Sequence, residues 1–232
     1  MQQTLITEDI FEFLKELEKN NNKEWFTEHK PQFKTMESKV KEFYNNILHM
    51  MGDHDDIEKL KMFRIYRDVR FSKDKTPYKV HFAGSFSRRG AALRGGYYLR
   101  LKPGESFVAA GFWEPNKEDL FRIRKEFERD SSEIREVLNS PALKKIWGSL
   151  QGDELKTAPK GFDKEDPNID LIRKKQFIFV KNFSDQEVFS PDFKNIVNDA
   201  FRAIRPYFDL MSDILTTNLN GESLLDHSSQ LK

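Results

Sequence analysis

The sequence contains no cysteine among its 232 residues, and this absence excludes several kinds of chemistry. Disulfide bonds, thiol nucleophiles and zinc sites with cysteine ligands all need that side chain. The five histidines, at positions 29, 49, 54, 81 and 227, include no close pair that would bind a metal. The sequence contains no Gly-x-Ser-x-Gly segment, which would indicate a hydrolytic triad. We therefore expect no metal site and no cofactor.

The chain also lacks a long apolar run and a clear excess of either charge. No apolar segment approaches the roughly 18 residues of a membrane-spanning helix, and residues 1–9 carry no basic, apolar export signal. Together with the missing cysteine, this predicts a cytoplasmic protein with no membrane partner. The 39 basic and 38 acidic residues give a net charge of only +1, which argues against a protein that coats nucleic acid non-specifically.

Phenylalanine, by contrast, is abundant. Its 21 copies can form a sizeable core although 33% of the residues are charged. Apolar residues at helical spacing predict helices towards both ends of the chain, among them residues 29–50 and a helix after Pro191 that bends or breaks at Pro206. Alternation and short connections predict antiparallel strands, which are residues 60–70, 82–88, 96–102, 106–113 and 175–182.

These patterns predict an α+β fold. A single, mostly antiparallel sheet of about five strands is expected to be covered by N- and C-terminal helices. Without a recognisable linker, residues 1–219 are expected to form one domain. Residues 220–232 lack apolar periodicity and are expected to form a mobile tail.

The stretch from Met62 to His81 is unlike the rest of this evenly charged chain. Between Arg64 and Lys79 there are six basic and two acidic residues, a local charge of +4. The first half alternates, which predicts a strand with one polar and one packed face. The polar face would carry Arg64, Tyr66 and Asp68, and the packed face Phe63, Ile65, Val69 and Phe71. The second half is rich in Ser, Asp, Thr and Pro and is expected to be a loop.

A local surplus of cations indicates an anion site, since Arg binds carboxylates and phosphates through paired hydrogen bonds. We therefore predict a pocket for an anionic, phosphate-bearing small molecule. The expected ligand-binding residues are Arg64, Arg67, Arg70, Lys75, Lys79 and Trp113, the last by stacking on a base or ring. The catalytic candidates are Asp68, Tyr78 and His81. Asp68, kept ionised by its basic neighbours, would orient an Arg or act as an acid or base, and the other two would donate hydrogen bonds or move a proton.

Two other interpretations fit the same residues. The run could be a docking surface for nucleic acid or for a protein, and binding to nucleic acid would then weaken steeply with added salt. Alternatively, its Arg and Asp residues could form cross-strand ion pairs of about 0.2–1 kcal/mol each that only stabilise a scaffold. No motif identifies a reaction, so enzymatic activity and oligomeric state are left open.

Three further features have a plain structural interpretation beside a functional one. Asn20 to Asn22 can form a helix-ending turn or the rim of a site. His54 among Asp53, Asp55 and Asp56 lacks the Gly and Glu of a calcium loop, so no metal is expected there. Residues 152–168 form a long connection that is either functional or loosely ordered.

The run from Arg67 to His81 resembles the central signature of an uncharacterised family, the domain of unknown function 2461. Other matching segments are Asn21–Phe26, Gly96–Tyr98, Gly111–Pro115 and Pro159–Phe162. The resemblance spans about residues 5 to 215. The chain departs from it at Asp166, where a His is expected in many members. The resemblance implies kinship and no established activity.

Overall fold

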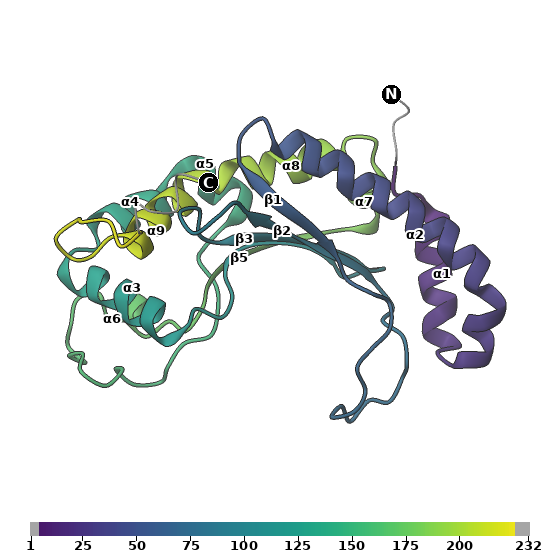
Figure 1. Ribbon diagram of the computed structural model, residues 1–232, viewed down its shortest axis with the longest axis horizontal. Helices are drawn as coiled ribbons and strands as arrows, with labels where there is room; N and C mark the ends of the chain where they lie inside the picture. Colours follow the sequence, from purple (N-terminus) through teal and green to yellow (C-terminus); the bar gives the residue numbers. More distant parts are fainter. Residues whose placement is uncertain (1–4, 226–232) are drawn as a thin grey trace. The chain divides into compact units, whose positions relative to one another are not determined.

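The structure, a computed structural model, describes residues 5–225 and has the α+β fold predicted from the sequence (Figure 1). Five antiparallel strands form one sheet, and each strand pairs with the next one along the chain. The strands are β1 Ile57–Met62, β2 Phe82–Arg88, β3 Gly96–Leu101, β4 Ser106–Phe112 and β5 Phe177–Phe183. Four of the five predicted strands therefore lie within two residues of their predicted bounds at each end.

The helices lie before β1, between β4 and β5, and after β5. They are α1 Glu8–Lys19, α2 Lys23–Met51, α3 Lys117–Arg129, α4 Ser132–Asn139, α5 Pro141–Trp147, α6 Ile169–Ile172, α7 Asp185–Phe189, α8 Phe193–Ala203 and α9 Arg205–Thr216. Side-chain capping is present at α3, where Asn116 accepts a hydrogen bond from the backbone N–H of Asp119, and at α7, where Ser184 and Glu187 form a capping box. None of the helices between residues 5 and 225 has the length and apolar character that crossing a membrane requires.

Helix α2 begins earlier than its apolar stripe indicates. The side chain of Asn22 accepts a hydrogen bond from the backbone N–H of Trp25 at 2.9 Å, and the helix then continues through Pro31. His29 stacks on Trp25 with ring centroids 3.9 Å apart, and its Nδ1 lies 2.8 Å from the carbonyl oxygen of the same residue. Through these two contacts His29 acts as a packing residue on α2.

The chain divides into two compact units, and the division passes through strands β2 to β5. Unit 1 comprises residues 1–86, 98–108 and 181–199, and unit 2 comprises residues 87–97, 109–180 and 200–232. The expectation that residues 1–219 form a single domain stays a prediction. Of the expected tail, residues 220–225 include Ser223, which forms a β-bridge with Thr217, and residues 226–232 lie outside the described part of the chain.

In unit 1, α2 packs against one face of the sheet. The buried ring of Tyr44 stacks on Phe86 with centroids 6.0 Å apart, and its hydroxyl donates a hydrogen bond to the carbonyl oxygen of Leu99 at 2.9 Å. Gly84 leaves room for this ring, since a Cβ there would lie 2.7 Å from it. Helix α1 lies beside α2 (Figure 1), and an ion pair of 3.0 Å joins Lys39 to Asp9.

In unit 2, aromatic rings from α8 and α9 form much of the core. Tyr207 is fully buried, and its hydroxyl donates a hydrogen bond to the carbonyl oxygen of Phe177 at 3.0 Å. Tyr97 packs against Phe208 with centroids 4.9 Å apart. The Nε1 of Trp147 donates to a backbone carbonyl of α8 at 2.9 Å.

The strand predicted over residues 60–70 has both bounds wrong, because β1 runs from Ile57 to Met62. Residues 63–81 form the connection from β1 to β2, and its two arms share an isolated antiparallel bridge between Tyr66 and Tyr78. There the N–H of Lys79 donates to the carbonyl oxygen of Ile65 at 2.7 Å and that of Arg67 to the carbonyl oxygen of Pro77 at 2.9 Å. Pro77 has no N–H to continue a ladder of hydrogen bonds. The predicted row of polar side chains on one strand face is therefore absent from this part of the chain.

Candidate functional site

Residues 63–81, here called the basic loop, carry every predicted site residue except Trp113. Figure 1 shows the loop extending away from β1 and β2. Its returning arm is held by Asn21, whose side chain accepts a hydrogen bond from the N–H of Tyr78 at 3.1 Å and donates one to its carbonyl oxygen at 3.0 Å. The buried ring of Tyr78 stacks on Phe26 at 4.0 Å. The asparagine segment thus forms a turn between helices, as one interpretation predicts, and Asn21 also clamps the loop.

Arg67 closes the basic loop on itself. Its guanidinium donates to the carboxylate of Asp74 and, at 2.6 Å, to the hydroxyl of Thr76. The backbone N–H of Thr76 and the guanidinium of Arg67 hold the pKa of Asp74 at about 2. The Nη1 of Arg67 therefore stabilises the conformation of the loop itself.

Asp68 and Arg70 form a second pair at the exposed part of the loop. Two nitrogens of Arg70 donate to the two carboxylate oxygens of Asp68, at 2.9 and 2.6 Å. Hydrogen bonds from the side chain and backbone of Arg70 lower the pKa of Asp68, which is therefore ionised at neutral pH. In this state Asp68 can orient Arg70, one of the predicted roles, and has no proton to donate as an acid.

A pocket of about 880 Å³, called the loop pocket below, lies against β1 and the basic loop. Its volume is within the range of small-molecule sites. The lining residues are Lys61, Met62, Phe63, Arg64, Tyr66, Arg67, Asp68, Val69, Arg70 and Lys79. Five of them are cationic and one is a carboxylate, so the lining carries a net charge of +4. The structure thus brings five predicted site residues to one pocket and adds Lys61, Phe63 and Tyr66, to which the sequence analysis gave no role.

Three of the five cations in the loop pocket have no salt bridge in the described part of the chain. Within residues 5–225, Lys61, Arg64 and Lys79 form no salt bridge with a carboxylate, whereas Arg67 and Arg70 each form one. Partial burial and the nearby charges of Arg64 and Arg67 lower the pKa of Lys79. The ammonium of Lys79 therefore lies near the like charges of Arg64 and Arg67 and has no salt-bridge partner between residues 5 and 225.

Tyr78 and His81 line a second, adjoining hollow of about 450 Å³, which shares Arg67 and Lys79 with the loop pocket. Burial, together with the charges of Arg100, Lys79 and Lys102, lowers the pKa of His81 to about 4. His81 is therefore neutral at pH 7 and can form hydrogen bonds without supplying an imidazolium proton. Burial and the nearby Tyr66 raise the pKa of Tyr78.

The two remaining predicted ligand contacts have other surroundings. Lys75 donates a hydrogen bond to the carbonyl oxygen of Val69 at 2.9 Å and thereby stabilises the loop. Trp113 belongs to unit 2, where it follows β4 and its side chain is exposed. The binding roles of both residues stay predictions.

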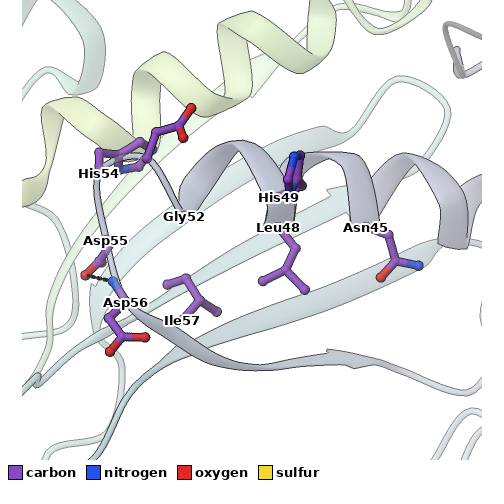
Figure 2. Close-up of a pocket in the computed structure, with 9 residues that line it drawn as sticks. Asn45, Leu48, His49, Gly52, His54, Asp55, Asp56 and Ile57 are labelled. Atoms are coloured by element: carbon purple, nitrogen blue, oxygen red, sulfur yellow. Dashed lines mark hydrogen bonds between the residues drawn. The ribbon is translucent and has the colours of Figure 1, made fainter. Parts of the chain in front are cut away.

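A different pocket, of about 770 Å³, lies at the C-terminal end of α2. Figure 2 shows His54, Asp55 and Asp56 in the turn after this helix, where Asp55 accepts a hydrogen bond from the backbone N–H of Asp56 at 2.9 Å. Three carboxylates and the negative end of a helix line this pocket, so it is a poor site for an anion. Over the described ranges no three acidic or histidine side chains are grouped as metal ligands.

Comparison with protein families agrees with the resemblance in the signature segments. Residues 9–210 match the family described as conserved hypothetical protein (DUF2461), so the match includes the basic loop and the Asn21 clamp. Searches of curated proteins and of solved structures find no match to the chain.

Proposed function

Because the chain belongs to the DUF2461 family, whose description names no activity, we propose a function from the chain's own geometry: the loop pocket binds a small anionic molecule that carries a phosphate group. The observation that carries the proposal is the cluster of Lys61, Arg64 and Lys79 in one pocket without a carboxylate partner between residues 5 and 225.

Electrostatics favours an anion in this pocket. Cations that lie close together without counter-charges repel one another, and burial together with the nearby charges of Arg64 and Arg67 lowers the pKa of Lys79. A bound phosphate would neutralise the cluster and accept several charge-assisted hydrogen bonds, the strong kind between N–H donors and anionic oxygens. Arg64 supplies a planar donor group and Lys79 a point charge.

The paired cations have a complementary role in this proposal. Arg67 is bound to Asp74 and Thr76 and fixes the shape of the loop, and Asp68 holds the guanidinium of Arg70 at the rim of the pocket. Asn21 anchors the returning arm that carries Lys79. A binding site held in this way requires less ordering when a ligand binds.

Calorimetric titration tests the proposal with inorganic phosphate, pyrophosphate, sugar phosphates and nucleotides at millimolar concentration. Removing one charged hydrogen-bond donor costs about 1.5–3 kcal/mol, so Arg64→Ala and Lys79→Ala are each expected to weaken binding at least tenfold. Lys73→Ala is the matched control: it removes the same charge from the same loop, outside the pocket lining, and is expected to change affinity less than about twofold.

Two outcomes contradict the proposal. One is that no compound of the panel binds to the wild-type protein. The other is that Lys73→Ala weakens binding as much as Arg64→Ala does, because the interaction would then be a diffuse attraction to a basic loop and not recognition in a pocket.

A further inference from the structure

The loop pocket contains exposed aromatic rings as well as cations. Phe63 and Tyr66 both line it, and their side chains are 36% and 53% exposed. Large apolar side chains are usually buried, so two exposed rings in one cationic pocket need an explanation. We propose, on the basis of the function proposed above, that the ligand is a mononucleotide whose base packs against Phe63 and Tyr66 while its phosphate binds Arg64 and Lys79.

The ring of Phe63 is held in place by its neighbours on the sheet. It packs against Tyr98 on β3 with centroids 6.1 Å apart, and Tyr98 in turn packs against Phe107 on β4 at 5.6 Å. The guanidinium of Arg100 lies over the ring of Phe107 at 5.2 Å. A supported ring offers contact area to a ligand with little loss of conformational freedom.

Cations surround the same ring. The ammonium groups of Lys61 and Lys79 lie 5.5 and 5.7 Å from the centroid of Phe63. A nucleotide combines a planar aromatic base, whose face can stack, with an anionic phosphate, and proteins bind that combination through aromatic rings with adjacent cations. A ligand with phosphate alone would leave the exposed parts of the Phe63 and Tyr66 rings in contact with solvent.

Tyr66 is supported from α2. Its ring lies 6.0 Å from Phe26 in an edge-on arrangement and 5.5 Å from Tyr78. Both aromatic residues of the pocket therefore have one packed side, although about half of the Tyr66 side chain is open to solvent. The pocket volume of about 880 Å³ suits a single nucleotide better than a long strand.

The test compares adenosine 5′-monophosphate with ribose 5-phosphate and with adenosine, by calorimetric titration of the full chain. We expect the nucleotide to bind on the order of tenfold more tightly than ribose 5-phosphate, because base stacking adds to phosphate binding. Phe63→Leu keeps the apolar volume but removes the aromatic face. It is expected to weaken binding of the nucleotide several-fold, because Tyr66 alone remains for stacking, and to affect ribose 5-phosphate less than the nucleotide.

Phe71→Leu is the matched control, since Phe71 belongs to the same loop and is 96% exposed but lies outside the pocket lining. It is expected to leave both affinities unchanged. If Phe63→Leu lowers the melting temperature and binds nothing, Tyr66→Leu provides a second measurement of the base-dependent part.

The outcomes separate this inference from the function on which it rests. Equal affinities for ribose 5-phosphate and the nucleotide would overturn the nucleotide assignment and leave the anion pocket intact. Binding of neither compound would overturn both. A hexanucleotide that binds more than tenfold more tightly than the mononucleotide, with steep salt dependence, would overturn the inference in favour of a nucleic-acid surface.

Discussion

At the scale of single residues, the cations of the basic loop have different surroundings, and these decide what each can do. Arg67 and Arg70 already donate to carboxylates within the loop, so a ligand would have to share them. Lys79 forms no salt bridge in the described part of the chain, and partial burial together with the nearby charges of Arg64 and Arg67 lowers its pKa. An anion therefore gains most from the residues whose charges are unmatched, and these are the ones that mutation should reveal first.

His81 allows a prediction about pH. Its pKa is about 4 in the folded protein and near 6.5 in an unfolded chain, so between these values the unfolded state binds more protons. The free energy of unfolding is therefore expected to fall as the pH drops from 7 to 5. For His81 alone the loss is up to about 2 kcal/mol, less if solvent screens the neighbouring charges.

Urea unfolding at pH 7 and pH 5 measures this contribution. His81→Gln is expected to lose less stability over that interval than the wild type. His49→Gln is the control, because His49 is exposed on α2 and is expected to keep the wild-type slope. Equal pH slopes for all three proteins would show that His81 is not held neutral by its surroundings.

At the scale of elements, the basic loop shows where reasoning from the sequence succeeds and where it stops. Charge counting singles out the segment, because a local surplus in a neutral chain is visible in the sequence alone, and a binding role for the segment stays a prediction. The alternation of residues 63–71 predicts a strand that does not form. Phe71, which occupies an apolar position of the pattern, is fully exposed as a result. Alternation describes a strand only where a partner strand can supply hydrogen bonds, and Pro77 in the opposite arm cannot donate one.

The contacts that hold the basic loop could not be predicted from the sequence for a different reason. Asn21 lies 57 residues from Tyr78, and nothing in the local sequence indicates that its amide bonds that backbone. Phe63 was expected on the packed face of a strand, whereas its exposure follows from the end of β1 one residue earlier. Pairing of a loop with a helix turn depends on the whole fold and not on local periodicity.

The Asn21 clamp leads to a prediction about the loop. Asn21→Ala removes two hydrogen bonds to the Tyr78 backbone, worth about 1–3 kcal/mol together, and should loosen the basic loop without unfolding the sheet. Hydrogen exchange is expected to become faster across residues 63–81 and to stay unchanged in β3 and β4. Asn20→Ala is the control, since the Asn20 side chain donates to the backbone carbonyl oxygen of Glu16 in the preceding helix and not to the loop. Unchanged exchange in the loop would show that the stacking of Tyr78 on Phe26 is sufficient to hold it.

At the scale of the whole molecule, the sequence predicts most strands and helices because their signals are local. The strand alternation after residue 82, the Ser184 capping box and the apolar spacing of α8 each act within one element. Tertiary contacts add what these signals omit, such as the hydroxyl of Tyr207 bonded to β5 and the space left by Gly84 for Tyr44. The prediction of a single domain concerns this level, because it depends on cooperativity between parts of the chain.

Strands β2 to β5 each contribute residues to both compact units, so the chain cannot unfold one unit without disturbing strands that also belong to the other. We therefore expect residues 1–219 to unfold in one cooperative transition. Trp147 is buried in unit 2 and gives a local probe when Trp25 and Trp113 are replaced by Phe, whereas far-ultraviolet circular dichroism reports on the whole chain. The two urea curves are expected to coincide in midpoint and slope. Midpoints that differ, with Trp147 fluorescence changing at a separate urea concentration, would mean that the shared strands do not couple the units and that the chain comprises two domains.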